Sequence, residues 1–394
     1  GATDLVQVRF RDVDVWFNRA GVGWTERTIA TGTPAAPSFA PRVRFADLDG
    51  SGTTDLVWAN AHRWEYLDLA GGRRPRLLVG VDNGLGADTR IEYGSSAEDY
   101  VRDLAAASAA SATAEPFTWA STPTGPDARL CALSGTAGRA CDPAEANRAD
   151  WLIRSSGSPV VSTVVRAVST SDRLDALGAR AQVSESRFAY HDGYYEGIEQ
   201  ELRGFGAADA TTLGDWNHPT VHSRTHFLQG RRPSDREDDR LLDNPNEALK
   251  GREVLTEVFD DAGAYLSTSF ASITNRHLLT GLDGRGVHYA FVHETNELRY
   301  DTTPFEPGTG TLTLPAVVRE TVGPGGAIVS TATSHERTLR IRGARAARIR
   351  TTFDEVDHLG HIHQQTAHGQ VGLLDAAGID GLIVSHIEPQ LVNA

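Results

Sequence analysis

The stretch from Phe45 to Trp58 reads Phe-Ala-Asp-Leu-Asp-Gly-Ser-Gly-Thr-Thr-Asp-Leu-Val-Trp, and it limits the fold of this chain more than any other stretch. Oxygen-bearing side chains recur at alternate positions, which is how a protein loop wraps a hard cation. The opening resembles an EF-hand loop, but Trp58 stands where a bidentate glutamate is needed, and the apolar flanks predict strands. We predict a Ca²⁺ loop between two strands, the alternative being a hairpin without metal. The predicted ligands are Asp47, Asp49, Ser51, the backbone carbonyl of Thr53, and Asp55.

A short repeat accompanies this loop. Thr3-Asp4-Leu5-Val6 returns as Thr54-Asp55-Leu56-Val57, 51 residues later. Segments at 13–17 and 24–28 carry β-branched and aromatic residues and predict strands, joined by a turn at 18–21. Repeats of about 40–50 residues built from short strands are typical of β-propeller blades. We therefore predict that residues 1–74 are the end of a propeller, with fewer than two blades present and the others upstream.

From residue 75 to residue 394 the sequence is a succession of strands and turns. An aromatic residue, an acid and a glycine recur together near 190–197, 258–265 and 352–361, which predicts successive antiparallel hairpins. Such a long sheet is expected to curl or close, because open edges pair with other chains. We also expect a short helix at 97–107 and a flexible insertion at 104–150. The insertion contains Cys131 and Cys141, for which a disulfide and two free thiols both remain open.

Composition excludes two classes of function. The net charge of −14 and the lack of a long Lys/Arg run argue against a nucleic-acid surface. No run approaches the roughly 18 apolar residues that a membrane-spanning helix requires. The sequence contains no Met and no leader, so we expect a fragment or a processed piece, and export cannot be inferred from a missing signal.

Candidate catalytic residues are few. His191 and Asp192 are adjacent and suggest an acid–base pair, but neighbouring side chains on a strand point to opposite faces, and we expect Asp192-Gly193 to form a hairpin turn. A carboxylate pair from Glu196, Glu199 and Glu201, and a zinc site at His361 and His363, are weaker alternatives. Nucleophile-elbow, phosphate-loop and dinucleotide motifs are absent. We predict that the chain is not an enzyme.

The motif Arg203-Gly204-Phe205-Gly206 has a structural explanation. Its glycines permit a bulge or a close backbone approach while Phe205 is buried, and Arg203 is expected to pair with Glu201 or Glu199.

An ordered set of motifs resembles a known family over most of the chain. The set comprises the calcium loop, Tyr66-Leu67-Asp68-Leu69, Asn83-Gly84-Leu85-Gly86, Ile91-Glu92-Tyr93-Gly94, Tyr190-His191-Asp192-Gly193-Tyr194-Tyr195-Glu196-Gly197, Arg203-Gly204-Phe205-Gly206 and Leu249-Lys250-Gly251-Arg252. It resembles the B component of insecticidal Tc toxin complexes and the related SpvB-type virulence proteins. The resemblance implies an all-β fold: a partial FG-GAP/VCBS-like propeller, followed by a large curled antiparallel sheet of the RHS/YD-repeat type.

The same resemblance implies a secreted or extracellular protein without enzymatic activity. Its implied partners are a C-type RHS component, with which it encloses a toxic polypeptide, and a pore-forming A component on which the propeller docks. The long insertion departs from the family pattern. Two other hypotheses stay open: a calcium-dependent adhesion or receptor-binding module, suggested by the loop and the acidic charge, and a hydrolase that uses residues 191–201.

Overall fold

The structure is a computed structural model. It describes residues 3–34, 43–59, 63–72, 74–111, 160–174, 178, 180–231, 243–300, 311–323, 326–341, 345–357, 361–375, 378–380 and 390–392. The chain divides into two compact units: unit 1 comprises residues 1–78, 93–98 and 161–164, and unit 2 comprises 79–92, 99–160 and 165–394. The predicted insertion at 104–150 lies mostly outside the described residues, as do Cys131 and Cys141.

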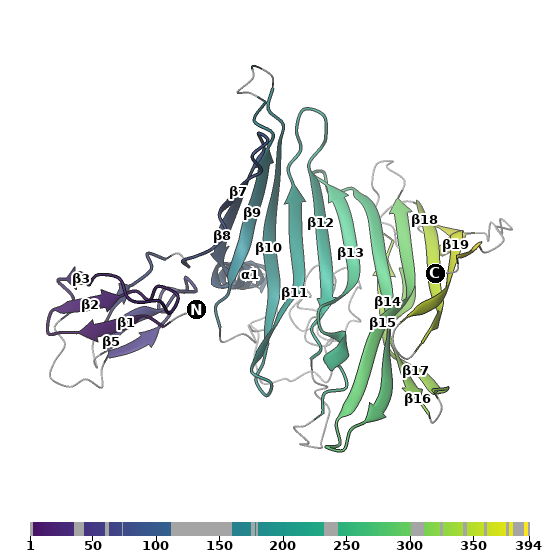
Figure 1. Cartoon of the computed structure of the whole chain (residues 1–394). Coiled ribbons are helices and arrows are strands. Elements are labelled where there is room, and N and C mark those ends of the chain that lie inside the picture. The colour runs from purple at the N-terminus through teal and green to yellow at the C-terminus, as the bar shows by residue number, and fades with distance from the viewer. Residues whose placement is uncertain are drawn as a thin grey trace. The chain divides into compact units, whose positions relative to one another are not determined.

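Unit 1 contains two small antiparallel sheets. The first is formed by β1 (Leu5–Val8), β2 (Asp12–Trp16) and β3 (Thr28–Thr31), and the second by β4 (Val43–Ala46), β5 (Asp55–Ala59) and β6 (Trp64–Asp68) (Figure 1). The strand predicted at 24–28 is wrong, because β3 begins at Thr28 and Trp24 forms only an isolated bridge with Asn18. A left-handed Ala20 and Gly21 lengthen the preceding turn, which delays the strand.

The two sheets repeat each other in register. Leu5 pairs with Trp16 in the first hairpin, and Leu56 pairs with Leu67 in the second, so both partners are displaced by 51 residues. The same displacement relates the Val8–Val13 pair to the Ala59–Trp64 pair. The repeat seen in four sequence letters is therefore a repeat of a whole β-hairpin.

The sheets of unit 1 pack together through faces that are not equivalent. One buried cluster contains Val13 and Val15 from β2 together with Leu56 and Trp58 from β5. Side chains alternate along a strand, and the residues that correspond to Val13 and Val15 in the second sheet are Trp64 and Tyr66. These lie on the other face from Leu56 and are 67% and 47% exposed. The packing is thus head to tail, which leaves an apolar outer face on each sheet.

Unit 2 is dominated by one sheet of fifteen strands. The end of β8 and the first residues of α1 and β9 are assigned to unit 1. Its main path follows chain order from β7 to β15 and then passes to β18, β19 and β20, while β16 pairs with β14 and β17, and β21 pairs with β19. The elements are β7 (Gly80–Asp82), β8 (Asp88–Ser95), α1 (Ser96–Ser111), β9 (Thr163–Ser171), β10 (Val183–Glu196), β11 (Glu201–Thr212), β12 (Val221–Leu228), the 3-10 helix η3 (Glu247–Leu249), β13 (Arg252–Asp260), β14 (Tyr265–Thr280), β15 (Gly286–Tyr300), β16 (Thr311–Val322), β17 (Ile328–Arg340), β18 (Arg345–Val356), β19 (Ile362–Asp375), β20 (Gly378–Asp380) and β21 (Gln390–Val392).

The large sheet branches at β14. The N-terminal half of this strand pairs with β13, whereas Ile273 to His277 pair in parallel with β16. The hairpin of β16 and β17 then contributes Leu314, Val317 and Leu339 to a buried cluster with Leu255 and Phe270 of the main sheet. A buried core cluster of unit 2 therefore lies at this branch, where residues of β16 and β17 pack against residues of β13 and β14.

The all-β class and the large, mainly antiparallel sheet predicted from the sequence are confirmed, and the strands twist progressively along it (Figure 1). The short helix expected at 97–107 is present as the longer α1.

Candidate functional site

The loop between β4 and β5 is the feature of the structure that most resembles a binding site. The last pair of the two strands joins Ala46 to Asp55, so residues 47–54 form the connection, between strands as predicted. Gly50 and Gly52 have φ angles of 71° and 81°, a conformation that glycine adopts without the steric cost of a Cβ. The glycines allow the loop to turn twice within a few residues and bring its acidic side chains together.

Backbone amides of the loop are used by its own carboxylates. Ser51 N–H donates to Asp47 Oδ1 at 3.0 Å and to Asp49 Oδ1 at 2.9 Å, and Gly52 N–H donates to Asp47 Oδ2 at 2.9 Å. The hydroxyls of Ser51 and Thr53 lie 2.8 Å apart. One carboxylate oxygen from each of Asp47, Asp49 and Asp55 lies within 4.8 Å of the other two. The predicted ligands are therefore close neighbours in the structure.

Asp55 differs from its neighbours because it is fully buried, with 0% of its surface exposed. Its Oδ2 accepts the amide of Leu48 at 2.9 Å, but its Oδ1 is buried without a hydrogen-bond partner among the described residues. Burial raises the pKa of Asp55, and the charges of Asp49, Asp68 and Asp47 act in the same direction, while the Leu48 amide opposes them. By contrast, hydrogen bonds from Ser51 lower the pKa of Asp49. A buried carboxylate oxygen without a partner is unusual in a folded protein.

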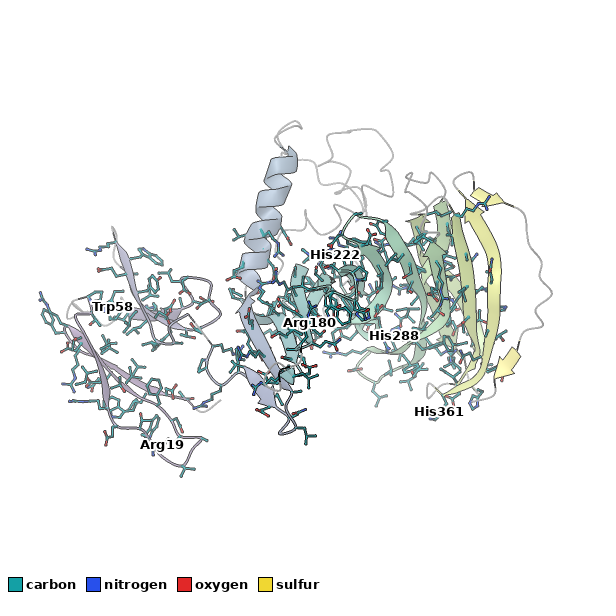
Figure 2. All side chains as sticks on the ribbon, turned by 90° about the horizontal axis from the view of Figure 1, so that it is seen from above. Arg19, Trp58, Arg180, His222, His288 and His361 are labelled. Atoms are coloured by element: carbon teal, nitrogen blue, oxygen red, sulfur yellow. The ribbon has the colours of Figure 1, made fainter. Side chains whose placement is uncertain are left out.

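The outer side of the loop is a packing surface. The Gly50 carbonyl accepts a hydrogen bond from the Ser95 hydroxyl, and a Cβ on Gly50 would lie 3.3 Å from the Ala97 Cβ. A Cβ on Gly52 would lie 3.3 Å from the Thr163 hydroxyl oxygen. Residues 95–97 and 163 belong to unit 1, and at these residues β8 ends and α1 and β9 begin. Trp58, on β5, faces the buried cluster of the same unit and is labelled in Figure 2.

His191 is a structural residue. It is only 3% exposed, and its Nδ1 lies 3.0 Å from a carboxylate oxygen of Asp103 on α1, with Nε2 3.4 Å from Asp209 on β11. Burial lowers its pKa, but hydrogen bonds and charge from Asp103 and Asp209 outweigh burial, and the net shift is upward. A substrate does not reach a side chain enclosed in this way, so the geometry favours an ion pair that anchors α1 on the sheet.

The hairpin turn expected at Asp192-Gly193 is wrong. Both residues lie inside β10, and the chain turns at 197–200 instead. Asp192 has a φ of 55°, and the register with β11 shifts between Gly193 and Tyr195, which is a β-bulge. A left-handed Asp followed by Gly fits a bulge as well as a turn, because both need the same backbone conformation.

The bulge at Asp192 packs closely against the motif Arg203-Gly204-Phe205-Gly206. Asp192 forms an ion pair with Arg231 at 2.8 Å, and a Cβ on Gly206 would lie only 2.5 Å from Asp192 Oδ2. The close approach predicted for this motif is therefore present. Arg203, whose side chain is fully buried, lies 3.4 Å from Glu201, as predicted, and 2.5 Å from Glu247.

The glutamates considered for glycoside hydrolysis have structural contacts. Glu196 is 3% exposed and accepts a hydrogen bond from Tyr194 at 2.9 Å, and Glu201 pairs with Lys250 at 2.8 Å. Lys250 also lowers the pKa of Glu201.

The histidines near the β18–β19 turn do not converge on a metal position. His361 Nδ1 and His363 Nε2 lie 3.0 Å and 3.3 Å from the same oxygen of Asp357, and His361 is labelled at this end of the sheet in Figure 2. His358 lies outside the described residues. Across the described part of the chain, Asp47, Asp49 and Asp55 form the one group of three potential ligands whose atoms meet within 4.8 Å.

Sequence reasoning missed an ionic network beneath α1. Asp99 pairs with Arg166 at 2.6 Å, and Asp209 forms a two-point contact with Arg224, with both distances 2.7 Å. Arg224 and burial act in opposite directions on Asp209, and its pKa is lowered overall. The available signal was the spacing of Asp99 and Asp103, which places two acids on one face of an alanine-rich helix.

Comparisons with known proteins agree on one family. Residues 18–121 match the family model described as "Insecticide toxin TcdB middle/N-terminal region", and no curated protein matches the sequence. The Tc holotoxin pore from Photorhabdus luminescens is similar in structure, with a TM-score of 0.57 and 16% identity over 92% of this chain and 15% of that chain.

Two crystal structures give similar values. TcdB2-TccC3-TEV has a TM-score of 0.56 and 17% identity, covering 94% of this chain and 16% of its own. TcdB2-TccC3 without its hypervariable C-terminal region has a TM-score of 0.57 and 16% identity, and the match covers 98% of this chain and 16% of the solved chain. The chain thus spans about a sixth of the length of these solved chains. In the described part of the chain, no helix is long and apolar enough to cross a membrane. The resemblance to the Tc toxin B component expected from the motifs is confirmed, because residues 18–121 match its family model and the fold of the chain is similar to that of the solved Tc toxin chains.

Proposed function

We propose that this chain is a structural part of a secreted toxin complex, located where the propeller of a B component ends and its β-shell begins. The observation that carries the proposal is the agreement between the toxin family model over 18–121 and the fold of Tc toxin chains over more than nine-tenths of the sequence. The role is one of enclosure and delivery. It requires a stable β-scaffold and no chemistry of the chain's own.

The packing of unit 1 supports a propeller. Propeller blades are alike and stack in one direction around an axis, so each presents a different face to its two neighbours. The two small sheets share their register, displaced by 51 residues, and pack head to tail. Their outer faces carry exposed apolar side chains, among them Leu5 on one and Trp64 on the other. Further copies of the same sheet would cover both.

The large sheet of unit 2 supports a shell. Its fifteen strands are paired largely in chain order, and long hairpins such as β14–β15 make the sheet nearly continuous. A large sheet of this kind can enclose a guest polypeptide and separate it from the solvent when further strands close the sheet. The solved relatives are TcdB2-TccC3 assemblies and a Tc holotoxin pore. We therefore propose a TccC-type RHS protein as the partner that completes the shell, and a pore-forming A component as the delivery partner.

Protease protection tests the enclosure. The full-length protein that contains this chain is co-expressed with a C-type RHS partner that carries a guest polypeptide, and the complex is treated with protease. We expect the guest to survive in the complex and to be degraded when the partner is expressed alone. Equal degradation in the two samples would refute the shell. Calcium-dependent binding to cells by the protein alone, without protection of any guest, would instead support the adhesion hypothesis.

A further inference from the structure

The acidic loop of unit 1 holds negative charge that the described protein does not neutralise. Asp47, Asp49 and Asp55 bring one oxygen each within 4.8 Å of the others, and none of the three forms an ion pair with an Arg or a Lys among the described residues. Asp55 is fully buried, and its Oδ1 has no hydrogen-bond partner there. Buried carboxylates are normally paired or bound to a metal, so a buried oxygen without a partner beside two other carboxylates is a group that a cation would satisfy.

The donor atoms select the kind of cation. The loop from 47 to 55 offers carboxylate and hydroxyl oxygens, and its sequence contains no His or Cys. Oxygen-only sites suit hard cations, whereas zinc and copper prefer nitrogen and sulfur. Mg²⁺ demands nearly ideal octahedral geometry and keeps several waters, while Ca²⁺ accepts irregular sets of six to eight oxygens. The oxygens of this loop, in which backbone amides hold Asp47 and Asp49, form an irregular set that suits Ca²⁺ better.

We propose that the β4–β5 loop is a Ca²⁺ site in which Asp47, Asp49 and Asp55 are the anionic ligands. Ser51 and the Thr53 carbonyl supply further oxygens after a small adjustment of the loop. The bound ion joins β5 to the turn that supports residues 95–97 and 163, because the Gly50 carbonyl already accepts the Ser95 hydroxyl. Calcium therefore stiffens the part of unit 1 where β8 ends and where α1 and β9 begin.

Tryptophan-sensitised Tb³⁺ luminescence tests the site directly. Trp58 lies three residues after Asp55 on the same strand, about 10 Å away, and serves as the antenna. We expect Tb³⁺ emission from the full chain, removal of that emission by Ca²⁺ and much weaker removal by Mg²⁺. Asp49→Asn should reduce Tb³⁺ affinity at least tenfold, and because Asp49 is exposed this variant keeps the fold. Asp55→Asn should abolish binding.

Asp260→Asn is the matched control. Asp260 lies in another acidic, glycine-containing turn, but its Oδ1 accepts the amides of Ala262 and Ala264, so its charge is already satisfied. We expect this variant to bind Tb³⁺ like the unmodified chain. Emission that is equal in Asp49→Asn and Asp260→Asn would overturn the proposal, as would displacement by Mg²⁺ at the same concentration as Ca²⁺. An absence of saturable emission would overturn it too.

Discussion

Replacing Leu56 with alanine, with Leu5→Ala as its repeat-related partner, tests the head-to-tail packing of unit 1. Leu56 is 0% exposed in the cluster between the two sheets, whereas Leu5, 51 residues earlier at the same register position, is 52% exposed. Leu→Ala removes three carbons, worth about 0.8 kcal/mol each when buried, and a cavity adds to the loss. We expect Leu56→Ala to cost about 3 kcal/mol and Leu5→Ala about 1 kcal/mol.

Native-state hydrogen exchange measured by mass spectrometry is the suitable assay, because it reports on β1 to β6 separately from the large sheet. A loss of about 3 kcal/mol lowers the protection of the slowest amides roughly 150-fold, and about 1 kcal/mol lowers it roughly fivefold. Equal effects of the two variants would refute the assignment of inner and outer faces. In a longer protein with a preceding copy of the sheet, the cost of Leu5→Ala should rise toward that of Leu56→Ala.

Three further predictions concern the rest of the chain. Chelation of Ca²⁺ should increase exchange at 47–55 and 95–97 and leave β12 and β13 unchanged, because a ligand stabilises only the part that binds it; unchanged exchange at the loop contradicts this. Burial, with Arg337 and Arg224, lowers the pKa of His226 to about 3, so the unfolded chain alone takes up this proton as pH falls below about 6.5. This group alone should lower the free energy of unfolding by about 2 kcal/mol between pH 7.5 and pH 5, so in urea titrations His226→Gln should change the difference between the two pH values by about that amount, while His222→Gln should not. Gly206→Ala, whose Cβ would meet Asp192 Oδ2 at 2.5 Å, should cost roughly 1–3 kcal/mol in the same titration, and Gly197→Ala, with open space around it, should cost much less.

Local patterns predicted the features whose determinants lie close together in sequence. The acidic loop was predictable because all its carboxylates fall within nine residues and the glycines between them set the turn. The Asp192-Gly193 pair shows where such reasoning fails. The dipeptide specifies a left-handed backbone, but the pairing of β10 with β11 over 183–212 decides whether that backbone forms a turn or a bulge.

The branch of the large sheet was beyond prediction for a related reason. β16 resembles the other strands in composition and length. It nevertheless pairs in parallel with the later part of β14, whose earlier part pairs with β13. What selects this partner is the burial of Leu314 and Leu339 against Phe270, more than forty residues away in the chain. The ionic network under α1 depends on the same kind of distant pairing, since Asp103 contacts His191 and Asp99 contacts Arg166 across more than sixty residues of sequence.

The 51-residue repeat shows most directly how the partner decides the role of a segment. Adding the displacement to β3, at 28–31, gives 79–82, and a strand does occur there as β7. In the first copy β3 pairs with β2 and completes a small sheet, whereas β7 pairs with β8 and belongs to the large sheet. The period therefore preserves the strand but not its partner. The 51-residue repeat of whole hairpins therefore ends near residue 80, where the equivalent strand joins the large sheet in place of a small one.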